Sequence, residues 1–358
     1  MTSAASAPGR LPVSVLTGFL GSGKTTVLDH LGRIGALSRT LVLVNEFGEV
    51  GLDHQLLTRI DDDTLVSMDS GCICCTIRSD LAETLDRAPG RYARGGERWF
   101  DRVVIETTGI ADPAPILQTL LSEPRLLRRY TLSRVVATVD AVNAEGTLDA
   151  HAEAHKQVAV ADRILITKAD LVGDAVVRRV RRRLEDLAPS VPAEIIRRGA
   201  AEADWFFAGA PWSPEGRSSE VAAWLAQEQD SHDEENDHGH QHGHEHGRDV
   251  NRHGRVYASA LVFDAPVDAR ALDACLEGLL LFRGSDLLRL KGIVHVAGME
   301  RPMVIHGVQH VFHPPEVLEH WPDDDRRSRI VLITRDLDHG LLRACFARFG
   351  LEPRITPA

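Results

Sequence analysis

The chain has 358 residues, 43% of them hydrophobic and 26% charged, which is ordinary for a soluble globular protein with two domains. Its net charge of −11 at pH 7 argues against nucleic acid as the main partner, because phosphate binding needs a basic surface. No stretch approaches the roughly 18 consecutive apolar residues of a membrane span, and residues 1–10 lack the basic start and apolar core of a secretory signal. We therefore expect a cytoplasmic protein with no membrane partner.

Short apolar runs alternate with helix-length segments through the first two hundred residues. The predicted strands are Val13–Thr17, Thr40–Val44, Leu65–Met68, Arg102–Glu106, Arg134–Asp140, Arg163–Thr167 and Glu194–Ile196. The predicted helices are Thr25–Ile34, Ser79–Asp86, His151–Ala161 and Ala175–Leu187. Strands that are apolar on both faces and alternate with helices predict an α/β fold of the P-loop NTPase kind, a mostly parallel sheet with helices on both faces.

The first predicted strand runs into Gly18–Thr25, which fits the phosphate-binding pattern G-x-x-x-x-G-K-[ST] in full. A strand before this loop and a helix after it aim backbone N–H groups and a helix N-terminus at phosphate oxygens. Lys24 should reach the β- and γ-phosphates, and the Thr25 hydroxyl should ligate Mg²⁺. The residues expected to bind the nucleotide here are Gly18, Gly21, Ser22, Gly23, Lys24, Thr25 and Thr26.

Three of the five cysteines fall within four positions, Cys72, Cys74 and Cys75. In a reducing cytosol such a cluster indicates a metal or redox site, not a disulfide framework. Three thiolates can hold Zn²⁺, with Co²⁺, Ni²⁺ or Cu(I) as alternatives, and a fourth ligand is missing from a closed site. Glu49 and His54, after the second strand, are candidates for that ligand. We interpret the cluster as an exchangeable metal site, with a cysteine redox centre as the alternative.

The position of the cysteines predicts a coupling to the nucleotide. They follow the Asn45–Asp53 loop, which we expect to act as a nucleotide-sensing switch, and precede the strand that ends at Glu106. Glu106 should organise Mg²⁺ and its water. A metal at the cysteines would share its surroundings with Mg²⁺ and GTP, so nucleotide state and metal affinity should change each other.

A later strand leads into Thr167-Lys168-Ala169-Asp170, which fits the guanine-reading pattern N/T-K-x-D. The Asp170 carboxylate can accept two hydrogen bonds from guanine, from N1–H and from the exocyclic amine. Lys168 would lay its aliphatic stem along the base. The order of this motif after the P-loop favours GTP over ATP.

The composition changes at residue 208. Residues 208–255 are rich in Gly, Pro, Ser, Asp, Glu and His, which predicts a flexible linker between a GTPase domain, residues 1–207, and a small α+β domain, residues 256–358. Five histidines stand there at every second position, His238, His240, His242, His244 and His246. We interpret them as a loose metal-binding arm, with a solvated spacer as the alternative.

The last hundred residues return to regular patterning. The predicted strands are Val256–Phe263, Leu287–Val296, Met303–Phe312 and Arg329–Thr334, and the predicted helices are Asp268–Leu281 and Asp338–Phe349.

Together these motifs resemble the CobW-type family of metallochaperone GTPases, related to the nickel-insertion GTPases of hydrogenase and urease. The resemblance is carried by Gly18–Thr26, Asn45–Glu49, Gly71–Cys75, Glu106–Gly109, Ala111–Pro113, Thr167–Asp170, Leu288–Gly292 and Gly307–Gln309. It implies a GTPase domain followed by the family's C-terminal domain, metal binding at the three cysteines, slow GTP hydrolysis, and delivery of the metal to a client apo-metalloprotein. Zinc is the expected metal, and cobalt, for cobalamin synthesis or nitrile hydratase maturation, is the alternative.

We therefore expect a GTP-hydrolysing metal chaperone with Lys24, Thr25 and Glu106 as its catalytic residues. A GTP-regulated metal buffer, which would store metal without transferring it, stays open. A P-loop small-molecule kinase is the third option, and the guanine motif and the thiolates argue against it. The oligomeric state is open as well, with a homodimer among the options.

Overall fold

A computed structural model describes residues 10–45, 65–68, 76–95, 97–188, 191–207, 256–284, 286–308, 311–312, 315–322 and 324–357. The predicted 208–255 linker, including the five alternating histidines from His238 to His246, lies outside these residues, so the linker stays a prediction. Within the described part, none of the helices combines the length and the apolar character that crossing a bilayer would need.

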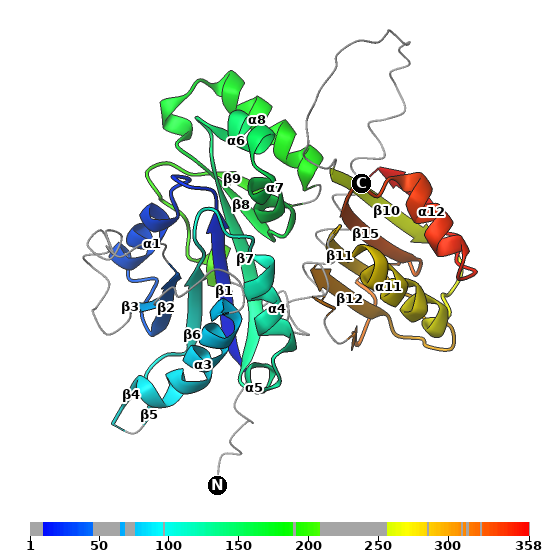
Figure 1. Ribbon diagram of the computed structural model, residues 1–358, viewed down its shortest axis with the longest axis horizontal. Coiled ribbons are helices and arrows are strands. Elements are labelled where there is room, and N and C mark those ends of the chain that lie inside the picture. The colour runs from blue at the N-terminus through cyan, green and yellow to red at the C-terminus, as the bar shows by residue number, and fades with distance from the viewer. Residues whose placement is uncertain are drawn as a thin grey trace.

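The larger domain is built on a seven-stranded parallel sheet with the strand order β3-β2-β6-β1-β7-β8-β9 (Figure 1). The strands are β1 (Leu11–Gly18), β2 (Thr40–Asn45), β3 (Leu65–Met68), β6 (Arg102–Glu106), β7 (Tyr130–Asp140), β8 (Arg163–Thr167) and β9 (Ala193–Ile195). A small hairpin, β4 (Ala93–Arg94) with β5 (Glu97–Arg98), stands apart from this sheet. The parallel sheet confirms the predicted α/β fold.

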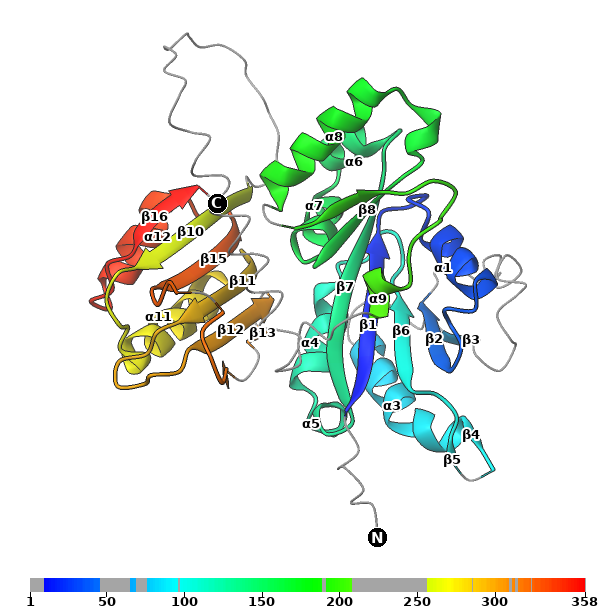
Figure 2. The same cartoon turned by 180° about the vertical axis from the view of Figure 1, so that it is seen from behind.

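Helices cover both faces of this sheet. They are α1 (Lys24–Arg33), α3 (Thr76–Arg91), α4 (Ala114–Ser122), α5 (Pro124–Leu127), α6 (Ala144–Ala150), α7 (Ala152–Ala159), α8 (Asp174–Leu187) and α9 (Asp204–Phe207). Alternation along β7 assigns the faces: Val135 packs in a core with α3 to α5, while Val136 packs in the core of α1 and α9. Figure 2 shows α9 over β1, on the face opposite to α3 and α4.

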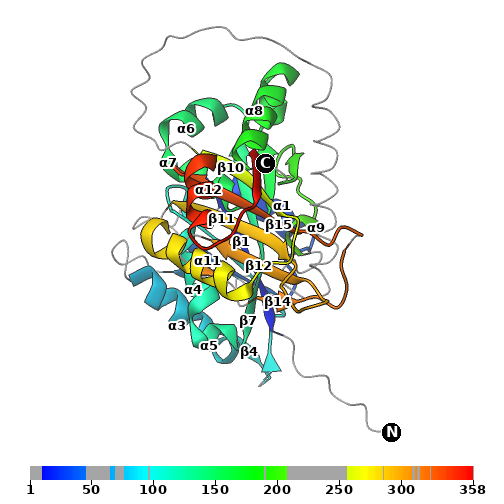
Figure 3. The ribbon, with the colours of Figure 1, turned by 90° about the vertical axis from the view of Figure 1, so that its right-hand side faces the viewer.

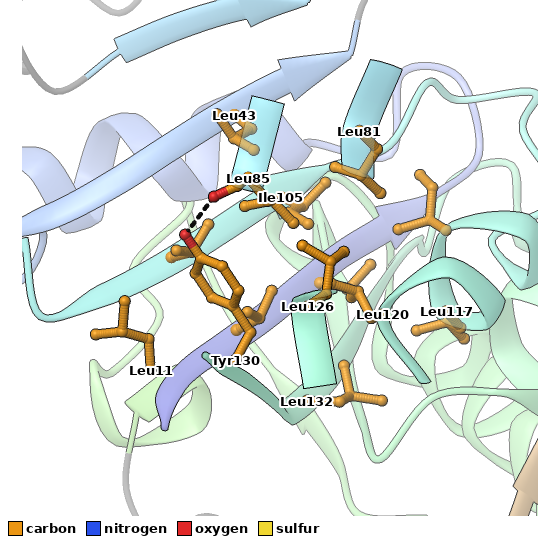
Figure 4. Packing of buried hydrophobic residues seen from close by; sticks show 14 of the residues in the cluster. Leu11, Leu43, Leu81, Leu85, Ile105, Leu117, Leu120, Leu126, Tyr130 and Leu132 are labelled. Carbon is orange, nitrogen blue, oxygen red and sulfur yellow. Dashed lines mark hydrogen bonds between the residues drawn. The ribbon is translucent and has the colours of Figure 1, made fainter. Parts of the chain in front are cut away.

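The core under α3, α4 and α5 is anchored by a buried tyrosine. The Tyr130 hydroxyl donates a hydrogen bond to the Leu85 carbonyl at 2.7 Å, and its ring lies among leucines of α3, α4 and the strands (Figure 4). Burial of the phenol raises the pKa of Tyr130 above its ordinary value. The hydrogen bond joins the start of β7 to α3.

The C-terminal domain is an antiparallel sheet with the strand order β13-β12-β11-β15-β10-β16, in which β14 also pairs with β12. Its strands are β10 (Val256–Phe263), β11 (Leu287–Val294), β12 (Met303–Val308), β13 (Val311–Phe312), β14 (Glu316–Val317), β15 (Ser328–Arg335) and β16 (Arg354–Pro357). Two helices, α11 (Ala269–Arg283) and α12 (His339–Ala347), cover the face turned away from the larger domain (Figure 3). Each begins at an aspartate, Asp268 or Asp338, whose side chain accepts from a first-turn N–H at 2.8 Å.

Several elements differ from the sequence-based expectation. The segment predicted as one strand, Met303–Phe312, forms β12 and β13, which pair with each other as a hairpin. The helix α4 was not predicted because it is short and begins between Pro113 and Pro115, residues that indicate a turn in a sequence. The C-terminal strand β16 was not predicted either.

Candidate nucleotide site

The loop Gly18–Thr25 joins the end of β1 to the start of α1, at the carboxyl edge of the parallel sheet where ligands of such folds bind. Gly18, Gly21 and Gly23 have φ angles of 143°, 70° and 94°, a region that side chains with a Cβ rarely adopt. At Gly18 a Cβ would also lie 2.2 Å from Thr138 Oγ1 and 2.7 Å from Ser22 Oγ. The glycines therefore let the backbone curl into a phosphate-sized loop.

Buried hydroxyl groups hold this loop from beneath. Ser22 Oγ and Thr138 Oγ1 share a hydrogen bond of 2.6 Å, and Thr167 Oγ1 donates to the Ser22 carbonyl at 2.7 Å. Thr138 Oγ1 also reaches the Thr17 carbonyl at 3.3 Å. The ends of β7 and β8 thus fix the shape of the loop before any ligand arrives. Thr167, predicted as part of the guanine-reading motif, contacts the P-loop.

The side chain of Lys24 folds back over the P-loop. Its Nζ donates to the Gly18 carbonyl at 2.8 Å and to the Phe19 carbonyl at 3.3 Å, and its side chain is buried. A cation held above a ring of loop amides is the arrangement that binds terminal phosphates.

Thr25 and Glu106 meet across the site. Thr25 Oγ1 donates to Glu106 Oε1 at 3.3 Å, and Glu106 is only 3% exposed at the carboxyl end of β6. A hydroxyl and a buried carboxylate next to a phosphate loop are oxygen donors of the kind that Mg²⁺ takes, so these two residues fit that ion.

A pocket of about 380 Å³ opens above these groups. It is lined by Leu20, Gly21, Gly23, Lys24, Thr25, Thr26, Val44, Glu106, Thr107, Thr108, Gly109, Ile110 and Lys168. One wall is the segment Thr107–Pro113, which we call the 107–113 loop. It lies tightly against the P-loop, since a Cβ at Gly109 would be 2.7 Å from the backbone N and Cα of Leu20.

The 107–113 loop is held on its other side by α7. Gln157 Nε2 donates to the carbonyls of Gly109 and Ala111 at 3.2 and 3.0 Å, and Lys156 Nζ pairs with Asp112 Oδ2 at 2.7 Å. Gln157 is 1% exposed. The loop beside the pocket is therefore clamped between the P-loop and α7.

The second motif borders the same pocket. Lys168 has a left-handed backbone, φ 56°, and its Nζ pairs with Asp140 Oδ2 at 2.7 Å. Asp140 also accepts from Asn143 Nδ2 and from the Val142 N–H, both at 2.8 Å. Burial opposes the charge of Asp140, but these three donors hold the pKa of its carboxyl below the ordinary value. Asp170 follows in the 3-10 turn η1 (Ala169–Leu171) with its side chain exposed, where it can accept from a ligand.

The sequence had singled out the P-loop, Glu106 and the Thr167–Asp170 motif, and the structure brings all of them to one edge of one sheet. It adds Thr138, Asp140 and Gln157. A threonine and an aspartate at the end of a long apolar run repeat the pattern that had identified Glu106 and could have been found on that signal. Gln157, a polar residue on a helix, carried none.

The predicted metal ligands Cys72, Cys74, Cys75 and Glu49, together with His54 and the histidines of the linker, lie outside the described residues. Elsewhere, in the part that the structure describes, no three His, Cys, Asp or Glu side chains gather as a metal site would require. The strand that leads to the cysteines is described: Met68, its last residue, pairs in register with Asn45, the residue after the partner of Glu106. Two strand spacings, about 10 Å, therefore separate the end of β3 from Glu106.

Both domains of the chain match known protein families. Residues 12–194 match the family described as CobW/HypB/UreG, nucleotide-binding domain, and residues 257–349 match the cobalamin synthesis protein cobW C-terminal domain. The zinc chaperone YjiA of Escherichia coli is 32% identical over 338 residues, 94% of this chain and 98% of that protein. The zinc chaperone CobW of Pseudomonas aeruginosa is 29% identical over 93% of this chain and 90% of its own length. The crystal structure of Zn(II)-bound YjiA GTPase from E. coli superposes with a TM-score of 0.59 at 27% identity, covering 95% of this chain and 99% of that one.

Proposed function

We propose that this chain, which belongs to the CobW/HypB/UreG family, hydrolyses GTP and uses that cycle to deliver a transition metal, zinc first of all, to a client apo-metalloprotein. GTP hydrolysis follows from the family and from the intact phosphate loop. The identity of the metal, its ligands and its delivery to a client go beyond what the family and the phosphate loop establish.

The roles in hydrolysis follow from the geometry of the pocket. Lys24 and the loop amides would hold the β- and γ-phosphates and stabilise the charge that develops on the transferred group. Thr25 and Glu106, 3.3 Å apart, would hold Mg²⁺ and its water, and Mg²⁺ would neutralise phosphate charge when bound. Asp170, exposed beside Lys168, would accept from the guanine edge.

The topology of the sheet supports a metal site next to the nucleotide. The strands β3, β2, β6 and β1 are consecutive neighbours, and all four point their carboxyl ends to the edge that carries the P-loop. The cysteine motif follows β3 by four residues and immediately precedes α3. An extended chain spans at most about 3.6 Å per residue. Cys72 can therefore lie no farther than four such steps from Met68, the last residue of β3.

The relatives support zinc as the metal, since two of them are named zinc chaperones. Cobalt is the alternative, because three thiolates also suit Co²⁺. A chaperone differs from a GTP-regulated buffer in that its metal leaves for an acceptor when the nucleotide changes.

The observation that carries the proposal is the Thr25–Glu106 pair in the nucleotide pocket. The strand β3, which leads into the cysteine motif, ends at the same edge of the sheet, two strands away from Glu106. A release experiment tests it. The chain is loaded with one equivalent of Zn²⁺, given Mg²⁺ with GTP or GDP, and the metal passing to a chromophoric chelator is followed against phosphate release. We expect release to follow GTP turnover and to slow in Glu106→Gln. Release at the same rate with GTP, with GDP and without nucleotide would favour the buffer.

A further inference from the structure

The sheet of the C-terminal domain is apolar on both faces, which a domain standing alone would not need. Ile330 and Leu332 of β15 pack under α11 and α12, whereas the alternate residues Val331 and Ile333 lie in a separate cluster with Ala159 of α7. The rest of that cluster comes from β11, β12 and the segment after β14, namely Leu288, Ile293, Val304 and Leu318. The second face of the sheet is therefore built to lie against α7 of the nucleotide-binding domain.

A buried ion cluster stands at this contact. Asp162, directly between α7 and β8, is 8% exposed and receives Arg289 Nη2 on its Oδ1, while Arg289 Nη1 donates to the Ala161 carbonyl. Lys291 Nζ lies 3.9 Å from the same carboxylate. We call Asp162, Arg289 and Lys291 the Asp162 cluster. Arg289 and Lys291 belong to Leu288–Gly292, one of the motifs that carry the family resemblance. This segment does not line the nucleotide pocket.

The carboxylate is also fixed within its own domain. Asp162 Oδ2 accepts from the Val135 N–H at 2.9 Å, and the Asp162 N–H donates to the Val135 carbonyl at 2.7 Å. Burial opposes its charge, but Arg289, Lys291 and the Val135 amide hold the pKa of Asp162 below the ordinary value. Asp162 thus joins strand β7 of one domain to strand β11 of the other.

The same helix α7 also holds the 107–113 loop, one wall of the nucleotide pocket. Lys156 and Gln157 bind the 107–113 loop through Asp112 and through the carbonyls of Gly109 and Ala111. The helix α7 ends at Ala159 and Asp162 follows it by three residues, so a shift of the loop that moves α7 acts on Asp162 through this short connection. The helix α4, which begins directly after the loop, touches β12 and β13 in addition.

We propose that α7 relays the nucleotide state of the 107–113 loop to the C-terminal domain, with Lys156 and Gln157 as its nucleotide-side contacts and the Asp162 cluster as the joint between the domains. The relay rests on the proposed function only in taking a guanine nucleotide as the ligand of the pocket. It gives the C-terminal domain a part in the cycle: its position against α7 reports whether the pocket is filled.

Hydrogen exchange on the full chain tests the relay. Amides of β10, β11 and β15 are followed without nucleotide and with Mg²⁺ and a non-hydrolysable GTP analogue. We expect the analogue to change their exchange rates about fivefold or more in the wild type, the lower range of ordinary coupling between sites. Arg289→Leu and Lys156→Met, which break the relay at its two ends, should each reduce that change to below about twofold.

Arg354→Leu is the matched control, because it removes an arginine that pairs at 2.9 Å with Asp264 on the surface of the same domain, away from α7. It should keep the full wild-type response. If Arg289→Leu does not fold, Lys156→Met carries the test, since Lys156 is partly exposed and the Asp162 cluster stays intact. A wild type that binds the analogue without any change in the C-terminal sheet, or variants that respond as the wild type does, would overturn the relay alone. A wild type that binds no guanine nucleotide would overturn the proposed function together with it.

Discussion

Replacing Thr167 by valine separates two roles for this residue. The sequence motif assigns it to guanine recognition, whereas its hydroxyl donates to the Ser22 carbonyl at 2.7 Å and to the Val139 carbonyl at 3.3 Å. Valine keeps the shape and removes the donor, so it opens no cavity. The P-loop then loses a support beneath Ser22, a residue that is 2% exposed.

The cost follows from the chemistry of a buried acceptor. A carbonyl that loses its hydrogen bond in the interior costs about 1–3 kcal/mol. If that cost destabilises the P-loop in the conformation that binds phosphates, the dissociation constant for nucleotide rises by about 5- to 150-fold. Since the lost support lies under the phosphates, GTP, GDP and inosine nucleotides should weaken by the same factor, as measured by calorimetric titration.

Thr334→Val is the matched control. Thr334 is fully buried in the C-terminal domain, and its hydroxyl donates to the Leu337 carbonyl at the same 2.7 Å. Both variants should lose comparable unfolding free energy in denaturant titrations, but only Thr167→Val should lose nucleotide affinity. A loss confined to guanine, with inosine nucleotides unaffected, would refute the supporting role and restore base reading.

Three further changes probe the same pocket. Glu106→Gln removes the buried carboxylate beside Thr25 and should lower the GTP turnover number by about a hundredfold, with GDP affinity nearly kept, in a phosphate-release assay. Asp170→Asn replaces an acceptor by a donor and should weaken GTP by about a hundredfold while improving binding of xanthosine nucleotides, whose ring carries a carbonyl where guanine has an amine; an unchanged base preference would contradict the assignment. Asp140 has a lowered pKa in the folded state, so its charge contributes stability that is present above the unfolded value of about 4 and is lost as the pH falls through the folded value. The unfolding free energies of the wild type and Asp140→Asn should therefore differ at pH 7 and converge at acid pH, and a constant gap would argue against the Lys168 pairing.

The sequence anticipates the strands of the large sheet because they are apolar on both faces, as with β6 and β8. It anticipates the P-loop, Glu106 and the Thr167–Asp170 motif because each is a local pattern at the end of such a strand. The helix α4 was not predicted, since the prolines Pro113 and Pro115 at its start indicate a turn in a sequence.

Contacts between distant segments leave no local pattern. Ser22 and Thr138 are 116 residues apart, and Asp162 and Arg289 are 127 residues apart, so only the folded chain brings them together. The local patterns that contain Ser22, Thr138 and Arg289 do not say which distant residue each one meets. The support of the P-loop and the joint between the domains were for that reason beyond the sequence.

The central claim is that the metal at the three cysteines and the nucleotide at the P-loop influence each other. The most direct measurement is a Zn²⁺ competition titration without nucleotide, with GDP and with a non-hydrolysable GTP analogue, on the wild type and on Cys74→Ser. We predict that the zinc affinity of the wild type changes about fivefold or more between nucleotide states, and that Cys74→Ser binds more weakly in all of them. Equal zinc affinity in the three states would contradict the coupling and leave a GTPase whose metal site is independent of its nucleotide.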